Sequence, residues 1–246
     1  MTNAIEERAP TQSQRALDGI RELLFSGVYA PGSRLSEPAI AERLQLSRTP
    51  VRAALARLEQ EGVVDAIPSG GFAVRTFAPA DILDAIELRG VLEGTAARLA
   101  AERGIAPSLS QALKKVLAEI DELLQASNYA LDHERYLDCN AAFHDLIKEA
   151  SGSSVIGREI DRLVSLPFAS PNALLMVQRE LPEFHASLQF AQAQHKALLE
   201  AIELREGTRA EALAREHARL ARRNLEVAMN DDRIKARYPA LTLVTG

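Results

Sequence analysis

The order of hydrophobic and polar positions at the start of the chain predicts three short helices. From Thr11 onward, apolar residues recur at helical spacing. They are Ala16, Leu17, Ile20, Leu23 and Leu24. A second helix is expected to begin after Ser36, whose hydroxyl can cap free amides, and to run to about Leu44. A third is expected over residues 47–61, because Gly62 is a typical C-terminal stop.

The pattern then changes to that of strands. Two β-prone runs, at residues 63–67 and 72–75, flank a turn at Pro68–Gly71, which predicts a β-hairpin. Three helices, with a short turn between the second and third, followed by a hairpin, form the order of a winged helix-turn-helix. We therefore predict such a domain at residues 11–76, preceded by a flexible arm at residues 1–10.

The rest of the chain has an almost entirely helical pattern, so the predicted fold is mostly α. Six helices are expected, at about 80–103, 108–126, 132–151, 154–178, 182–206 and 208–229. Pro167 and Pro171 interrupt the fourth of them. This pattern predicts an all-α six-helix bundle at residues 81–230, with a linker at 77–80 before it and a tail at 231–246 after it.

The composition is that of a folded protein with two domains. The chain has 246 residues, of which 47% are hydrophobic and 26% charged, and this length suits two domains of common size. No apolar stretch reaches the roughly 20 residues that span a bilayer, and residues 1–10 lack the apolar run of a signal peptide. Cys139 is the single cysteine, so no internal disulfide is expected and the expected location is cytoplasmic.

The net charge of −5 does not exclude binding to nucleic acid. Residues 1–79 contain nine arginines, no lysine and nine acidic residues, so this part is neutral and the remainder carries the whole negative excess. Arginine binds guanine edges and phosphates through two hydrogen bonds. A basic surface on this chain is therefore expected to be local and built from arginine.

The expected third helix has one buried and one polar face. The buried stripe consists of Val51, Ala54, Leu55 and Leu58. Thr49 and Arg52 point away from that stripe, and Arg48 lies on its flank. Arginine and threonine near a helix N-terminus suit the major groove of DNA. An ordinary amphipathic helix with solvated arginines is the alternative, but the order of helices, turn, arginines and hairpin favours DNA binding.

Three of the five histidines fall in the middle of expected helices. They are His144, His195 and His217. Asn140 lies one helical turn before His144, on the same face. Three imidazoles and a side-chain oxygen from different helices of a bundle form a ligand set for a divalent metal ion. Sequence spacing also allows each of them to be an ordinary core or surface residue, and His133 and His185, near helix starts, are expected on the surface.

Three segments of the first domain resemble the DNA-binding domain of the GntR family of bacterial regulators. The segments are Pro31–Glu37, Ser47–Leu55 and Leu58–Val63. The resemblance covers nearly all of residues 11–76, and it implies contacts to DNA from the recognition helix and its surroundings and a wing tip in or over the minor groove. The residues so implied are Arg34, Arg48, Thr49 and Arg52, with Gly70 and Gly71 at the wing tip.

The second domain resembles the FCD effector domain, which defines the FadR subfamily of this family. The resemblance rests on Glu87–Glu93, Ala96–Ala101, Asn140–His144, His195 and Glu216–Arg219. The number of expected helices, six rather than seven, resembles that of the VanR-like group. Members of this kind commonly hold Zn or Ni between an Asp or Asn and three His, and a carboxylate effector completes the coordination. The resemblance thus implies a divalent metal ion with the ligands Asn140, His144, His195 and His217.

Asn140 stands where Asp is frequent in such domains. A neutral amide oxygen is the weaker ligand and removes one negative charge from the site. This difference either lowers metal affinity or leaves more positive charge for an anionic effector.

Arg89, on the first helix of the second domain, is expected to pair with an effector carboxylate. Its position beside Leu88 suggests partial burial, and a guanidinium can bind a carboxylate through two hydrogen bonds. A surface salt bridge to Glu87 or Glu93 is the alternative.

Together these features predict an effector-responsive transcription regulator rather than an enzyme. A homodimer is expected to bind a two-fold symmetric double-stranded DNA operator, with recognition helices about 34 Å apart and no membrane contact. A small carboxylic acid would release it from DNA through the linker, which requires a coupling of about 1–3 kcal/mol. An aromatic acid such as vanillate is favoured, with sugar acids and short hydroxy- or dicarboxylic acids as competitors.

Two other functions stay open from the sequence. One is a metal-dependent enzyme of the helical-bundle kind, but such enzymes usually carry Glu three residues before a histidine ligand. Ala141, Gln192 and Ala214 occupy those places. The other is a regulator whose C-terminal domain only dimerises.

Overall fold

The computed structural model describes residues 11–125, 131–166, 168–173, 175, 184–231, 233–234, 238, 241 and 243–245. The chain divides into two compact units, of which one comprises Met1–Phe77 with Tyr238–Gly246 and the other Ala78–Arg237. The arm predicted at residues 1–10, Pro167 and parts of the predicted tail lie outside the described residues. Among the described helices, none is both long and apolar enough to cross a membrane.

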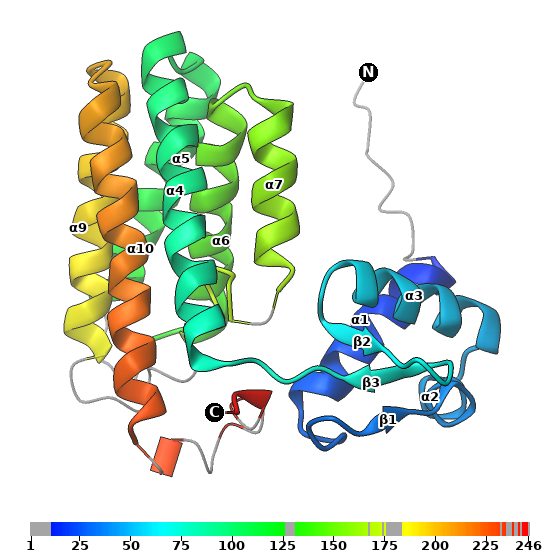
Figure 1. The fold of residues 1–246 in the computed structure, drawn as a ribbon. Helices are drawn as coiled ribbons and strands as arrows, with labels where there is room; N and C mark the ends of the chain where they lie inside the picture. Colours follow the sequence, from blue (N-terminus) through cyan, green and yellow to red (C-terminus); the bar gives the residue numbers. More distant parts are fainter. Residues whose placement is uncertain are drawn as a thin grey trace. The chain divides into compact units, whose positions relative to one another are not determined.

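The first unit contains the three predicted helices. They are α1 (Gln12–Phe25), α2 (Glu37–Leu44) and α3 (Arg48–Gln60) (Figure 1). Thr11 and Ser36 cap α1 and α2, since each hydroxyl accepts a hydrogen bond from the backbone N–H three residues further on. The predicted apolar stripes are buried in one core. It includes Ala16, Leu17, Ile20 and Leu24 from α1 and Val51, Ala54, Leu55 and Leu58 from α3.

The predicted hairpin is part of a three-stranded sheet. The strands are β1 (Arg34–Leu35), β2 (Val64–Ala66) and β3 (Phe72–Val74). Their order is β1-β3-β2, with β3 antiparallel to both neighbours. The sequence analysis did not predict β1, because a strand of two residues shows no alternation. The sheet completes a winged helix-turn-helix, as predicted.

Part of the C-terminal segment belongs to this first unit. Val244 forms an isolated parallel bridge with Phe77. The Phe77 amide donates to the Leu243 carbonyl at 2.8 Å, and the Thr245 amide donates to the Phe77 carbonyl at 2.9 Å. Leu241 and Leu243 are buried. These described residues of the segment predicted as a tail are therefore ordered by backbone pairing at the end of the first unit.

Six helices occupy the described part of the second unit, as predicted for an all-α bundle. They are α4 (Pro79–Arg103), α5 (Pro107–Gln125), α6 (His133–Ala150), α7 (Ser154–Val164), α9 (Phe184–Glu203) and α10 (Gly207–Met229). Helix α4 is central: it packs along α10 and also contacts α6, α7 and α9 (Figure 1). It therefore carries buried polar side chains into the interior of the bundle.

The helix predicted at 154–178 is shorter than expected, because α7 ends at Val164. A turn follows in which Phe168 has a φ of 66°, a left-handed conformation that a bulky side chain seldom adopts. Pro171 lies in the same turn. Proline lacks the N–H that a helix interior requires. The described residues 168–173 of the predicted helix form a turn in which Phe168 and Ala169 are buried.

Two glycines allow α4 and α10 to approach closely. A methyl group at Gly90 would lie 2.9 Å from the Ala218 methyl, and one at Gly94 would lie 3.0 Å from the Glu211 carbonyl oxygen. Both distances are shorter than ordinary van der Waals contact. The two glycines thus set the separation of the helices that carry Arg89 and His217.

The Gly94→Ala substitution is expected to lower the free energy of unfolding by about 1–3 kcal/mol, because the helices must separate to admit the methyl group. Gly157→Ala in α7 is the matched control, since its methyl group would meet only the Lys148 side chain at 3.8 Å. This control is expected to stabilise by up to about 1 kcal/mol through helix propensity. Urea unfolding followed by circular dichroism measures both, and equal effects would contradict the close approach.

Candidate functional site

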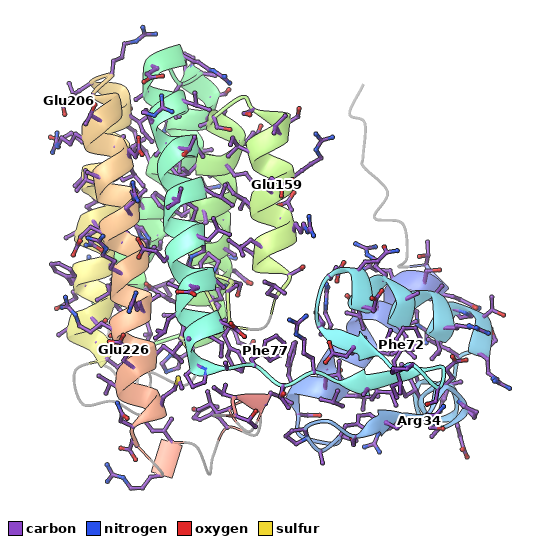
Figure 2. The ribbon with its side chains drawn as sticks, viewed as in Figure 1. Arg34, Phe72, Phe77, Glu159, Glu206 and Glu226 are labelled. Atoms are coloured by element: carbon purple, nitrogen blue, oxygen red, sulfur yellow. The ribbon has the colours of Figure 1, made fainter. Side chains whose placement is uncertain are left out.

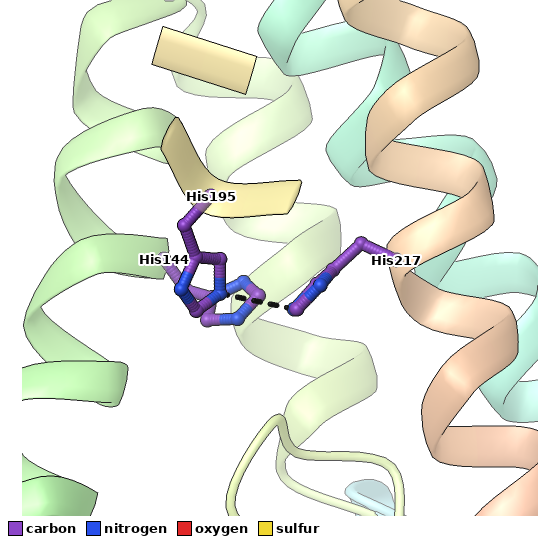
Figure 3. Close-up of side chains that lie close together, drawn as sticks. All are labelled: His144, His195 and His217. Carbon is purple, nitrogen blue, oxygen red and sulfur yellow. Dashed lines mark hydrogen bonds between the residues drawn. The ribbon is translucent and has the colours of Figure 1, made fainter. Parts of the chain in front are cut away.

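Three histidines from three helices meet inside the second unit. His144 comes from α6, His195 from α9 and His217 from α10, and Figure 3 shows their rings gathered together. Each offers one ring nitrogen, and these nitrogens lie within 4.8 Å of one another. His195 is fully buried and the other two are partly buried. The structure thus brings together the three imidazoles that were expected to bind a metal ion.

The protonation of His195 follows from its neighbour Gln192. Its Nδ1 lies 3.3 Å from Gln192 Oε1. The amide nitrogen of Gln192 donates to the Leu117 carbonyl at 2.9 Å and to Asp121 Oδ1 at 3.0 Å, which assigns the orientation of this side chain. Oε1 is therefore the acceptor, and His195 carries its proton on Nδ1. Its Nε2 lone pair points toward the other two histidines.

The Nε2 atoms of His195 and His217 lie 3.1 Å apart, as the dashed line in Figure 3 marks. His217 Nδ1 lies 3.0 Å from the Oε1 of Gln194, a buried acceptor for its proton. In that tautomer two lone pairs face each other, which is unfavourable unless a cation lies between them. Two imidazoles bound to one zinc ion have nitrogens roughly 3.0–3.4 Å apart, so the observed separation fits a shared ion.

Glu93 of α4 holds the third ring. Its carboxylate lies 3.1 Å from His144 Nδ1, while His144 Nε2 is buried and has no hydrogen-bond partner among the described residues. Burial alone would raise the pKa of Glu93, but His144 and Arg89 outweigh this effect and lower the pKa to about 2. Glu93 is therefore an acceptor for the Nδ1 proton at neutral pH.

The electrostatics of the site favour metal binding. Burial, and then the neighbouring rings, lower the pKa of His195 well below its usual value; burial and His144 lower the pKa of His217 to about 3. Both rings are neutral at neutral pH, as metal ligation requires. An oxygen acceptor on each Nδ1 orients the ring and raises its basicity as a ligand. Three such nitrogens suit Zn or Ni better than a hard ion such as Mg.

A pocket that is partly open to solvent lies beside His144 and His217, and its empty space, including the part open to solvent, is about 410 Å³. Its lining includes Arg89, Asn140, His144 and His217 together with apolar residues such as Leu188. Most of the residues predicted to bind metal or effector therefore share one cavity.

Arg89 is 2% exposed and makes only part of its hydrogen bonds inside the protein. Its Nη1 donates to the Ala169 carbonyl at 3.0 Å, and its Nε lies 3.9 Å from Glu93 without a hydrogen bond. Burial lowers the pKa of Arg89, and Glu93 opposes that shift. The sequence analysis considered a surface salt bridge from Arg89 to Glu87 or to Glu93. The pair with Glu93 is present but buried, whereas Glu87 pairs with Arg219 at 3.9 Å.

Sequence reasoning missed the residues that hold the rings. The sequence analysis considered Glu93 only as a salt-bridge partner of Arg89. It mentioned Gln192 only because bundle enzymes usually carry Glu three residues before a histidine ligand. Gln192 lies three residues before His195 and therefore on the same face of α9. That spacing was the available signal, whereas Gln194 and Glu93 meet their histidines only through contacts between helices.

The N-terminal end of α3 presents the residues predicted to contact DNA. Arg48 and Arg52 expose 69% and 77% of their side chains, and Thr49 is exposed. Both arginines lie 3.9 Å from Glu37, a weak attraction at the surface. Ser47 makes no side-chain capping bond. The first turn of α3 thus combines exposed arginines with amides that can bind phosphate.

The tip of the hairpin requires glycine. Gly70 and Gly71 have φ values of 90° and 95°, and the Ile67 amide donates to the Gly71 carbonyl at 2.9 Å across the turn. Arg34 of β1 donates from Nη2 to the Gly70 carbonyl at 2.6 Å. Its side chain is labelled beside that of Phe72 in Figure 2, where β1 pairs with β3. Arg34 therefore lies against the wing tip and remains exposed.

Two family models match the chain. Residues 12–74 match bacterial regulatory proteins of the gntR family, and residues 84–220, more than half of the chain, match the FCD domain. The two matches correspond to the winged helix-turn-helix and to the helical unit.

Similar proteins are transcription regulators, in agreement with the prediction that the chain is not an enzyme. An HTH-type regulator from the TAR-I ttuE-ttuC' intergenic region of Agrobacterium vitis is 40% identical over 33% of this chain and 48% of its own length. The Glc operon transcriptional activator of Escherichia coli K12 is 26% identical over 89% of this chain and 91% of its own.

Coverage differs among these comparisons. The chain spans about half the length of the first curated relatives that it matches. The structure of Escherichia coli McbR/YncC superimposes with a TM-score of 0.64 at 21% identity, covering 89% of this chain and 97% of that one. This last likeness supports the fold.

Proposed function

Because the chain belongs to the gntR family of bacterial regulatory proteins and is a transcription regulator with an FCD effector domain, we propose that a small carboxylic acid controls its binding to operator DNA. The acid binds in the cavity beside Arg89 and a divalent metal ion, and its binding releases the protein from DNA. The regulator acts as a homodimer on a two-fold symmetric operator.

The observation that carries this proposal is the arrangement of the three histidines. His144, His195 and His217 each have an oxygen acceptor beside Nδ1. The Nε2 of His144 has no hydrogen-bond partner within the described residues, and the Nε2 atoms of His195 and His217 lie 3.1 Å apart. Asn140 adds a side-chain oxygen in the same cavity. We propose these four residues as ligands of Zn or Ni. When bound, the ion supplies positive charge that attracts the effector carboxylate.

Arg89 supplies the other positive charge for the effector. Its guanidinium lines the cavity, and its buried Nε has no hydrogen-bond partner within the described residues. A buried donor without a partner is costly. A carboxylate in the cavity would satisfy such donors with charge-assisted hydrogen bonds.

In the first unit, Arg48, Thr49 and Arg52 contact the major groove. Arg34 with Gly70 and Gly71 contacts the minor groove or its phosphates. The exposed side chains and the uncapped start of α3 support this assignment. The linker predicted at residues 77–80 carries the effector signal between the units.

The more specific parts of the proposal are the direction of regulation, repression or activation, and the identity of the acid. Repression relieved by the acid is proposed, with an aromatic acid such as vanillate favoured. Assignment to the VanR-like group stays a prediction. A relative of similar length is named the Glc operon transcriptional activator, and another is the Nta operon transcriptional regulator of Aminobacter aminovorans. The test must therefore detect both release of the protein from DNA and stronger binding of the protein to DNA when the acid is present.

Thermal denaturation of the metal-loaded protein against a panel of carboxylic acids tests the proposal. Aromatic acids, sugar acids, hydroxy acids and dicarboxylic acids are each compared with the corresponding amide. DNA binding is then measured with and without each acid that raises the midpoint. If no acid stabilises the protein or changes its DNA affinity, the C-terminal domain only dimerises and the effector proposal is wrong.

The Arg89→Lys variant is expected to bind the active acid about 10-fold more weakly, while it keeps its affinity for operator DNA. Lysine retains the positive charge beside Glu93 but loses the two-pronged hydrogen bonding of arginine. Arg98→Lys is the control, because Arg98 lies on the same helix and pairs with Glu102 and Glu211 outside the cavity. Isothermal titration with the acid measures both variants; equal affinities would argue against Arg89 as the carboxylate partner.

A further inference from the structure

A metal ligand that is asparagine has an orientation problem that aspartate does not have. The oxygen and nitrogen of an amide are similar in size, but only the oxygen binds a cation. Either end of Asn140 would fit its buried position beside His144. A chain with asparagine here therefore needs something that selects the orientation.

Asn172, in the turn after α7, makes this selection through two hydrogen bonds. Its Nδ2 donates to the Leu137 carbonyl at 2.8 Å. A backbone carbonyl can only accept, so the Oδ1 of Asn172 must face the other way. That Oδ1 accepts a hydrogen bond from Asn140 Nδ2 at 2.8 Å.

The directions of these two hydrogen bonds leave only the oxygen of Asn140 free to face the cavity. With its nitrogen held by Asn172, its Oδ1 is the remaining polar atom, and Asn140 lines the cavity with His144 and His217. If Asn140 turned over, its oxygen would face the oxygen of Asn172. Asn172 cannot follow without losing its bond to Leu137.

We propose that Asn172 is a positioning residue that holds Asn140 with its oxygen toward the metal site. It compensates for the asparagine at a position where aspartate would need no such partner. The proposal rests on the proposed metal centre. It assigns to the turn after α7 a role in metal affinity.

A double-mutant cycle with the full-length protein tests the proposal. Asn172→Leu is similar in size and removes both hydrogen bonds, whereas Asn140→Asp presents an oxygen in either orientation. Affinities for Zn²⁺ and Ni²⁺ alone are measured by competition with a chromophoric chelator. The thermal midpoint of each metal-free variant is recorded in parallel.

Asn172→Leu is expected to weaken metal binding about 10-fold or more when residue 140 is asparagine, as loss of outer-shell partners generally does. In the Asn140→Asp background the same substitution is expected to change metal affinity less than about threefold. The drop in metal-free midpoint should be larger in the asparagine background, because the bond between Asn140 and Asn172 is lost there together with the Leu137 bond, whereas only the Leu137 bond is lost when residue 140 is aspartate.

The outcomes separate this inference from the proposed metal centre. Equal losses of metal affinity in the two backgrounds would mean a general structural role for Asn172 and would overturn the inference. Unchanged affinity in Asn172→Leu alone would overturn it as well, with the metal centre intact. A wild-type protein that binds neither ion would overturn both.

Discussion

The His217→Ala variant is expected to lose its response to Zn²⁺ or Ni²⁺ entirely. It removes one of three imidazole ligands, and because changes to outer-shell partners already cost 10- to 100-fold, the loss of affinity should exceed about 100-fold. In the wild type, an ion at about 100 times its dissociation constant should add about 2.7 kcal/mol of stability. For a domain of this size that corresponds to a rise of roughly 5–10 °C in the thermal midpoint.

The measurement is thermal denaturation after chelation and after reloading, with the metal content determined directly. His133→Ala is the matched control, since His133 starts α6 and lies outside the group of three histidines. This control is expected to show the full shift. A wild-type midpoint that does not respond to either ion, or an equal response in His217→Ala, would contradict the metal centre.

The same variant bears on how the site is built. In the metal-free protein His144 Nε2 is buried and has no hydrogen-bond partner within the described part of the chain. Such a group is costly in a folded protein unless it serves a ligand. We therefore expect that, without metal, His217→Ala lowers the free energy of unfolding by less than the replacement of a fully buried core histidine would.

Local periodicity predicted most of the fold. The stripe that includes Ile20 and Leu24 predicted α1, and the Gly70-Gly71 pair predicted the hairpin, because each pattern reflects contacts within a few residues. Strand β1 was missed since Arg34–Leu35 has no pattern of its own and pairs with β3, far along the chain. The length of α7 was overestimated because the turn that follows Val164 also contains buried apolar residues, such as Phe168, which look like a continued helical stripe.

The candidate site was predictable to the extent that motifs carry it. His144, His195 and His217 were singled out by their mid-helix positions and by resemblance, but their convergence depends on packing between helices. Glu93, Gln194 and Asn172 reach the site from other elements at sequence separations that no local pattern encodes. Their roles became apparent only from contacts in three dimensions.

The pairing of Phe77 with the C-terminal segment escaped prediction for a similar reason. Residues 231–246 have no periodicity, and a single parallel bridge to Val244 leaves no trace in the sequence. Backbone hydrogen bonds hold it, and they are independent of side-chain identity.

The Arg52→Ala variant is expected to lose about 10- to 100-fold in affinity for its operator and to tolerate substitutions at one base pair of each half-site. Arg52 is 77% exposed on the outward face of α3 and has only a distant attraction to Glu37, at 3.9 Å. It can therefore leave that carboxylate and bind the edge of a guanine through two hydrogen bonds. Such a contact contributes about 1–3 kcal/mol of discrimination.

Selection from random double-stranded DNA gives the operator, and fluorescence anisotropy at fixed salt then measures each variant, since salt alone changes such affinities strongly. Arg57→Ala is the matched control. Arg57 is 61% exposed on the same helix, but it pairs with Glu61 at the far end from the uncapped N-terminus. Both variants remove one positive charge, so a difference between their DNA affinities must come from a direct contact.

Equal effects would exclude the N-terminal end of α3 from the interface. A loss in Arg52→Ala that is uniform across all sequences, with a shallower salt dependence, would show that Arg52 binds phosphate and does not read a base.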